Sequence, residues 1–142
     1  MFGKKSSSLL LPTNERFDTL IGKTSEIYGR MVVGESLRID GKVVGNIECE
    51  ENSKVTVAVG EDGEVIGDIF AYRVIIAGKV EGNIYATERV EFHHTSQVRG
   101  DVTYGSIGIE HGARVIGLVI QGADKNSTNH ASDVIRAVQE RR

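Results

Sequence analysis

A unit of the form aliphatic–x–glycine–x–aliphatic recurs six times along the chain. The residue two before each glycine is Ile or Val, and the residue two after it is Met, Ile or Val, without exception. Two of the copies, GKVVGNI at 41–47 and GKVEGNI at 78–84, differ only in having Val44 or Glu81. Such agreement indicates a structural repeat. The central glycines are Gly29, Gly45, Gly67, Gly82, Gly100 and Gly117.

A second alternating segment precedes five of these units. These segments are LRI at 37–39, VTVAV at 55–59, VII at 74–76, VEF at 90–92 and IGI at 107–109. Alternation with period two, in residues that are mostly β-branched, predicts strands with one buried face. Between the strands stand turns that contain glycine, such as GEDG at 60–63, where the chain must bend sharply.

A unit this short cannot bury its apolar side alone, but stacked copies can, because each aliphatic side chain then covers its equivalent in the preceding coil. The predicted fold is therefore all-β, a single-stranded parallel β-helix (solenoid) of about six coils over residues 17–123. Successive glycines are 16, 22, 15, 18 and 17 residues apart. This spacing breaks the regular period of a left-handed hexapeptide helix, and only one face carries the glycine. We therefore expect a right-handed solenoid.

The two terminal segments differ from the repeat. Residues 1–16 are polar and serine-rich behind an apolar head, and we expect a disordered tail there. Residues 124–142 are expected to form a C-terminal tail. Its end can form a short helix, with Val134, Ile135 and Val138 on one side and arginines at the end.

Composition and charge narrow the classes of function. The chain has 17 glycines, one proline and one cysteine, Cys49, so it can form no intrachain disulfide, which suits a reducing compartment. Residues 17–124 hold 10 basic and 17 acidic side chains, a net charge of −7, whereas each terminal segment is weakly basic. An acidic body argues against nucleic acid as a partner, because binding to its backbone needs a clustered basic surface.

The histidines are the candidates for chemistry. In the repeat frame His94 and His111 occupy the same turn of adjacent coils, and His93 stacks on Glu110 one position earlier. Two imidazoles and a carboxylate there could bind zinc, as in a β-helical carbonic anhydrase. A metalloenzyme similar to carbonic anhydrases or acyltransferases, using His93, His94 and His111, is thus the alternative function. Solvated turn residues are the favoured interpretation, and no catalytic constellation is evident, so we expect neither enzyme activity nor a cofactor.

The end coils carry the full apolar pattern, although solenoids usually need polar caps. Uncapped ends favour stacking on other molecules, and stacking at both ends makes a filament. The interface predicted from this pattern comprises Phe17, Leu20, Ile21, Ile27 and Met31 in the first coil and Ile107, Ile109, Val115, Leu118 and Val119 in the last.

The first five residues, MFGKK, place two apolar side chains beside two lysines. Anionic lipid attracts each lysine by about 1 kcal/mol, and one buried aromatic adds about 2 kcal/mol. A single copy would bind a membrane weakly, but a row of copies on a polymer would bind well. Met1, Phe2, Lys4 and Lys5 are therefore the predicted membrane-binding residues.

The six V-x-G-x-I coils, the short solenoid and MFGKK resemble the bactofilins, a family of bacterial cytoskeletal proteins. The resemblance covers residues 17–123 and the first five. It implies a right-handed β-helix that polymerises with copies of itself, head to head and tail to tail, into non-polar filaments without nucleotide. It also implies a cytoplasmic scaffold, attached to the inner face of the membrane by its N-terminal tail, that supports cell shape and localises cell-wall enzymes. The helical character of the C-terminal segment departs from the family's plainly disordered tail.

Overall fold

The computed structural model describes residues 16–122, and within this range the chain is built from sixteen β-strands without a helix. The expected tails, at 1–16 and 124–142, lie outside the described residues except for Arg16. Among the described residues no helix has the length and hydropathy to cross a membrane. The strands are β1 (Thr19–Ile21), β2 (Glu26–Tyr28), β3 (Met31–Val33), β4 (Leu37–Ile39), β5 (Lys42–Val44), β6 (Ile47–Cys49), β7 (Thr56–Val59), β8 (Glu64–Ile66), β9 (Ile69–Ile76), β10 (Lys79–Glu81), β11 (Ile84–Phe92), β12 (Gln97–Arg99), β13 (Val102–Tyr104), β14 (Ser106–Ile109), β15 (Arg114–Ile116) and β16 (Val119–Gln121).

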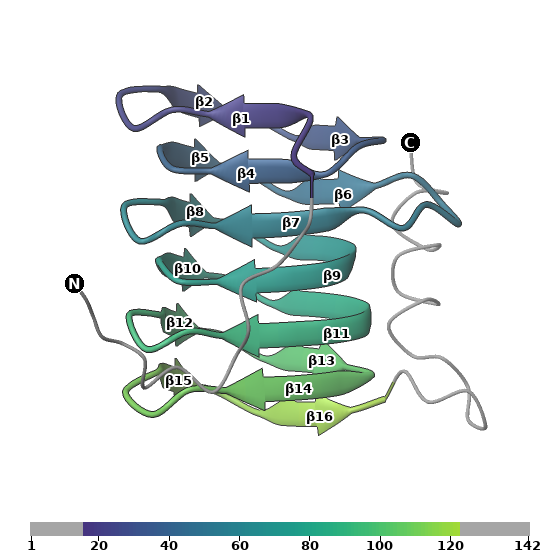
Figure 1. Ribbon diagram of the computed structural model, residues 1–142, viewed down its shortest axis with the longest axis vertical. Helices are drawn as coiled ribbons and strands as arrows, with labels where there is room; N and C mark the ends of the chain where they lie inside the picture. Colours follow the sequence, from purple (N-terminus) through teal and green to yellow (C-terminus); the bar gives the residue numbers. More distant parts are fainter. Residues whose placement is uncertain (1–15, 123–142) are drawn as a thin grey trace.

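Equivalent strands of successive coils pair in parallel, which gives the solenoid three faces (Figure 1). Face A holds β1, β4, β7, the second halves of β9 and β11, and β14. Face B holds β2, β5, β8, β10, β12 and β15. Face C holds β3, β6, the first halves of β9 and β11, β13 and β16. The chain visits the faces in the order A, B, C six times, so the six predicted coils are confirmed.

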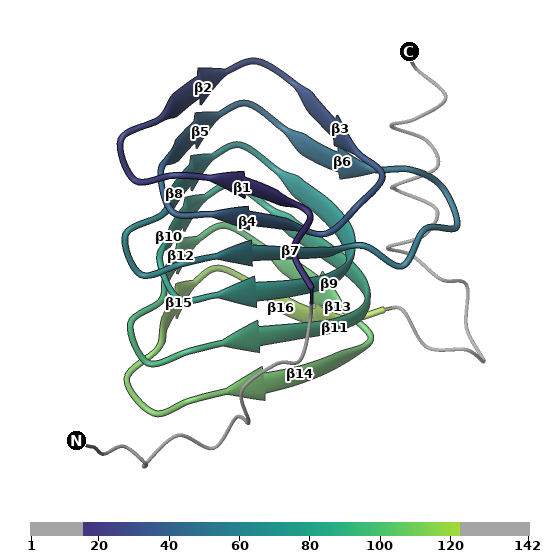
Figure 2. The ribbon, with the colours of Figure 1, turned by 45° about the horizontal axis from the view of Figure 1, so that its top comes forward.

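The solenoid is right-handed, as the irregular glycine spacing predicted. In Figure 2, with the N-terminal coil toward the reader, the chain runs clockwise through β1, β2 and β3 while later coils recede. The expected parallel β-helix is thus confirmed.

The aliphatic columns that flank the repeat glycines form the core. On face B, Val65 lies between Val43 and Val80 in strict register, and all three side chains are at most 1% exposed. On face C, the equivalent column of Ile47, Ile69 and Ile84 is fully buried. Each coil therefore presents the same apolar cross-section to its neighbours, which is why the sequence repeats.

The repeat glycines stand at the corner between faces B and C. All six have positive φ, between +134° and +152°. A Cβ atom at Gly67 would lie 2.1 Å from the carbonyl oxygen of Gly45 in the coil before it. The corner therefore requires glycine both for its backbone conformation and because successive coils approach closely.

A ladder of amide and carboxylate side chains follows these glycines, one residue later. Each side-chain Oδ1 accepts a hydrogen bond from a backbone N–H of the next coil, at 2.8–3.0 Å. The ladder comprises Asn46, Asp68, Asn83 and Asp101. Arg30 holds this position in the first coil and Leu118 in the last, so the ladder is confined to the coils between them.

Candidate functional site at the two ends of the solenoid

The large apolar side chains that are exposed in residues 16–122 lie in the first and last coils. Coils two to five contribute none of them. They are Leu20, Tyr28 and Val32 in the first coil, and Ile109, Ile116, Leu118, Val119 and Ile120 in the last. Exposed apolar surface gathered in this way marks a site of association.

At the C-terminal end the core itself is uncovered. Ile109 and Val119 pair in register with Phe92 and Val102, which are fully buried, yet they are 48% and 43% exposed. Their side chains occupy inward positions and meet solvent because the part of the chain that the structure describes holds no further coil. Among the described strands, β14, β15 and β16 pair only with the coil before them, so each leaves one edge open. An open parallel edge beside apolar side chains is a template for further stacking.

A rim of outward-facing apolar residues surrounds this end. Ile116, Leu118 and Ile120 are 59%, 64% and 42% exposed. Ile107 and Val115, which the sequence also placed in the interface, are half-buried.

The N-terminal end is smaller in apolar area and more polar. Leu20 and Tyr28 are 62% and 68% exposed. The Tyr28 hydroxyl donates to Glu26 Oε1 at 2.7 Å, and this hydrogen bond raises the pKa of Tyr28. Of the other residues predicted for this end, Phe17, Ile27 and Met31 are half-buried, whereas Ile21 is 5% exposed.

Sequence reasoning missed four of the exposed apolar residues at these ends, namely Tyr28, Val32, Ile116 and Ile120. These four residues occupy the outward positions of their strands, and the alternating pattern predicts only that outward side chains face solvent. Comparison with the two preceding coils could have found Ile116, because its position is Glu81 in the fourth coil and Arg99 in the fifth. The same position is Val44 in the second coil and Ile66 in the third, so the comparison gives no signal for Tyr28. The membrane-binding residues predicted at Met1, Phe2, Lys4 and Lys5 lie outside the described residues.

The histidine turn is assembled as the repeat frame predicted. Glu110 is 3% exposed, and its Oε1 accepts the backbone N–H of His94 at 2.8 Å. The same oxygen lies 3.2 Å from His94 Nδ1 and 3.7 Å from His93 Nδ1. The Glu110 carboxylate, in coil six, thus binds the turn of coil five that contains His93 and His94. His111 is exposed. No group of three His, Cys, Asp or Glu side chains in the range 16–122 is arranged to hold a metal ion.

The single cysteine lies at the end of β6 and is 4% exposed. Burial raises the pKa of the Cys49 thiol and outweighs its hydrogen bond with Ser53, which acts in the opposite direction. Cys49 is therefore a buried thiol of low reactivity.

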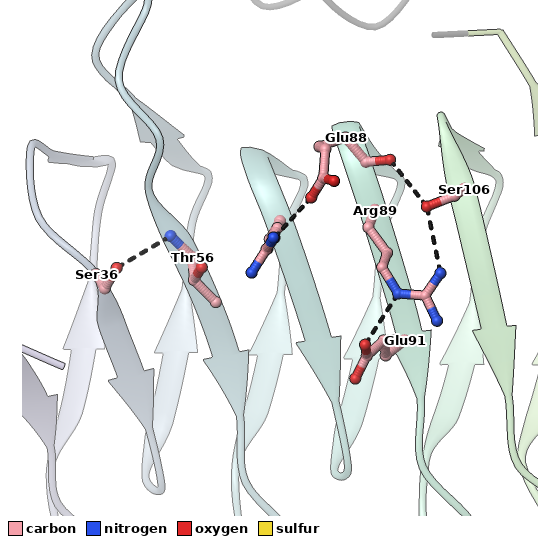
Figure 3. A network of polar contacts seen from close by, with 7 residues as sticks. Ser36, Thr56, Glu88, Arg89, Glu91 and Ser106 are labelled. Atoms are coloured by element: carbon pink, nitrogen blue, oxygen red, sulfur yellow. Dashed lines mark hydrogen bonds and ion pairs between the residues drawn. The ribbon is translucent and has the colours of Figure 1, made fainter. Parts of the chain in front are cut away.

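Polar contacts at the corner between faces C and A tie coils together (Figure 3). Arg73 Nε lies 2.6 Å from Glu88 Oε1 in the next coil, and Arg89 Nη1 donates to Ser106 Oγ at 3.3 Å. These groups are partly exposed, so each pair contributes modestly to stability. They link neighbouring coils along the side of the solenoid.

A short β-solenoid with open, apolar ends defines a class of rod-shaped protein suited to self-association. A family model described as "Bactofilin: Polymer-forming cytoskeletal" matches residues 19–119. The chain therefore belongs to the bactofilin family and is a polymer-forming cytoskeletal protein, as the sequence resemblance indicated.

Two curated relatives come from Myxococcus xanthus (strain DK1622). Bactofilin BacO is 37% identical over 102 residues, which cover 72% of this chain and 78% of BacO. Bactofilin BacP is 31% identical over 105 residues, which cover 74% of this chain but only 42% of BacP. No solved structure matches the chain significantly.

Proposed function

We propose that the chain polymerises end to end, without nucleotide, into filaments in which like ends meet. The observation that carries the proposal is the confinement of exposed large apolar side chains to the first and last coils. Burying such side chains contributes about 25 cal/mol per Å², and the flanks of the middle coils offer no comparable surface.

The ends favour contacts between like ends over head-to-tail stacking. Head-to-tail stacking would place Leu118 of one molecule against the Arg30 position of the next. The Arg30 guanidinium forms a bidentate ion pair with Glu48. Its Nε donates to Glu48 Oε2 and its Nη2 donates to Glu48 Oε1, both at 2.8 Å. Leu118 offers no acceptor, so the side-chain ladder could not continue across the junction. In an isologous contact, two identical ends meet, so the apolar residues of one end pack against the same residues of the partner. Alternation of contacts between C-terminal ends and contacts between N-terminal ends gives a filament without polarity.

Electron microscopy of the purified protein tests the proposal. We expect filaments at micromolar concentration in buffer that contains neither nucleotide nor metal. Monodisperse particles under these conditions would contradict it.

A charge introduced at the open core tests the C-terminal contact. Val119→Arg and Leu118→Arg should yield short species, because a charge buried at a dry contact is costly. The matched control is Glu81→Arg, since Glu81 is exposed on β10 in the middle of the rod. The control should form normal filaments, and normal filaments from the Val119 and Leu118 variants would move the interface elsewhere.

We further propose attachment to the inner face of the cell membrane through residues 1–5. The support is the apolar and basic character of MFGKK together with the many copies that a filament presents. Deleting residues 1–5 should abolish sedimentation with anionic vesicles while filaments persist. Zwitterionic vesicles are the control, since they lack the charge that attracts Lys4 and Lys5.

Such a membrane-attached filament would serve as a scaffold for cell shape and for proteins of cell-wall synthesis. The support for this role is membership of a polymer-forming cytoskeletal family and the length that end-to-end assembly gives a short rod. Depleting the protein should alter cell shape, and restoring the Val119→Arg variant should not rescue it, whereas Glu81→Arg should.

A further inference from the structure

The outer surface of face C differs from those of the other two faces. Its outward positions form a row in strict register along the whole rod, here called the face C strip. The strip comprises Val32, Glu48, Phe70, Tyr85, Thr103 and Ile120. Its one charged member, Glu48, is paired with Arg30. Face B has two outward rows, of which one is polar in these strands, with Lys42, Glu64, Lys79 and Gln97, and the other holds Val44, Ile66, Glu81 and Arg99.

The middle of the strip is apolar and closely packed. The rings of Phe70 and Tyr85 stack with centroids 4.8 Å apart and an angle of 3° between their planes. Phe70, Glu48 and Thr103 are only 3%, 1% and 3% exposed, although they occupy the strand positions that alternate with the buried column. Burial also raises the pKa of Tyr85. The ends of the strip, Val32 and Ile120, are 40% and 42% exposed.

Parallel sheets are normally covered on both sides, and an outward aromatic side chain reaches such low exposure only under a second layer. The described strands supply no such layer, since Figures 1 and 2 show a single wall along β6, β9, β11 and β13. The low exposure of these outward side chains therefore indicates an additional segment over the strip.

The C-terminal segment has the position, length and charge to do so. The described chain ends at Gly122, directly after β16, which is the last strand of face C. From coil six to coil two is about 19 Å, and residues 123–131 can reach about 30 Å when extended. The segment beyond them carries Val134, Ile135 and Val138 and ends in Arg141 and Arg142.

Charge favours this occupant over a second rod. Residues 125–142 carry a net charge of +2, whereas residues 17–124 carry −7, so two bodies repel each other while the tail is attracted. The far end of the strip is flanked by Glu50 and Glu51, both exposed, in the turn after β6. The terminal arginines are complementary to this acidic turn.

We propose that residues 123–142 fold back along the rod and cover the face C strip, with their apolar side chains on Phe70 and Tyr85 and their arginines near Glu50 and Glu51. In this position the tail lies on the flank and leaves the open C-terminal core free to stack. The inference concerns a contact within one molecule and does not depend on polymerisation.

Photo-cross-linking of the full chain tests the proposal. A benzophenone amino acid at Ile135, in the Leu118→Arg background and in a mixture of isotope-labelled and unlabelled chains, reports both the target and its molecule of origin. We expect cross-links within one chain to residues 69–86. Cross-links confined to residues 106–121 would put the tail over the end, and cross-links between chains would make the occupant a second copy. Either result, or no cross-link, overturns the proposal. The same group at Lys79 on face B is the control and should not reach the tail.

Truncation supplies a second measurement. A chain that ends at Gly122 should bind the dye ANS several-fold more strongly than the full chain, because the aromatic strip becomes exposed. Arg141→Glu combined with Arg142→Glu should move dye binding in the same direction. Unchanged dye binding on truncation would contradict the proposal, whereas filaments from the truncated chain would agree with it.

Discussion

At the corner between faces B and C, each repeat glycine combines a positive φ with close approach to the coil before it. Gly67, with φ of +149°, lies against the backbone of Gly45. The conformation costs other residues about 1–3 kcal/mol, and the approach leaves no room for a Cβ. The repeated glycine is thus a requirement of stacking and carries no chemistry of its own.

Gly67→Ala should therefore destabilise the fold by about 2–4 kcal/mol, from backbone strain and overpacking together. Gly22→Ala is the matched control, because a Cβ there meets no atom within 4 Å. Urea unfolding in the Leu118→Arg background, where assembly adds no stability, measures both. A loss at Gly67 no larger than that at Gly22 would contradict the steric account.

Cys49 gives a prediction with a pH dependence. Its thiol pKa is raised mainly by burial, so the folded chain holds less thiolate at a given pH than the unfolded chain does. Modification by a maleimide should be at least about 100-fold slower in the folded chain than in urea. The rate should rise as pH increases through the ordinary thiol range and beyond. Equal rates in buffer and in urea would show that the thiol is accessible.

Residue patterns predicted the core well and the surface less well, for a physical reason. Inward positions such as Val65 and Ile69 must fit the same cross-section in every coil, so they repeat. Outward positions face different neighbours, and parity alone sends Phe70 to solvent, although it is 3% exposed. The burial of Glu110 could not be predicted from the sequence either. Its carboxylate accepts a hydrogen bond from the backbone N–H of His94, and a backbone partner does not depend on residue type.

At the scale of the element, the side-chain ladder after the glycines orders the coils relative to each other. Its members alternate along the rod as Asn46, Asp68, Asn83 and Asp101. Every rung supplies an acceptor, but no two carboxylates are adjacent. The alternation keeps the hydrogen bonds while avoiding repulsion between like charges about 5 Å apart.

Asn83→Asp tests this alternation, because it keeps the acceptor and creates three successive carboxylates. At neutral pH it should cost about 1 kcal/mol for each neighbouring carboxylate. Repulsion raises the pKa of the introduced carboxyl above that of an unfolded aspartate. Stability relative to the parent should therefore be lost as pH rises through that pKa and be regained on acidification.

The control for this variant is Asn83→Ala, which removes the acceptor for the Asp101 N–H without adding charge. It should cost about 1 kcal/mol, with little dependence on pH. Urea unfolding at several pH values measures both. If the loss in Asn83→Asp is independent of pH, repulsion is not its cause.

At the scale of the whole molecule, the two ends are unequal. Of the eight exposed large apolar side chains in residues 16–122, five belong to the last coil and three to the first. In the first coil Tyr28 also donates a hydrogen bond to Glu26. A filament built from alternating isologous contacts contains two kinds of junction. Because apolar burial drives both, the junction between C-terminal ends should be the stronger.

Blocking one junction at a time should reveal this difference. Leu20→Arg disables the N-terminal junction and should leave dimers joined through C-terminal ends at low micromolar concentration. Leu118→Arg disables the stronger junction and should leave mainly monomers. Sedimentation velocity distinguishes the two, with Glu81→Arg as the polymerising control. Stable dimers from Leu118→Arg together with monomers from Leu20→Arg would reverse the order of strengths, and the asymmetry in apolar area would then not decide how the filament is joined.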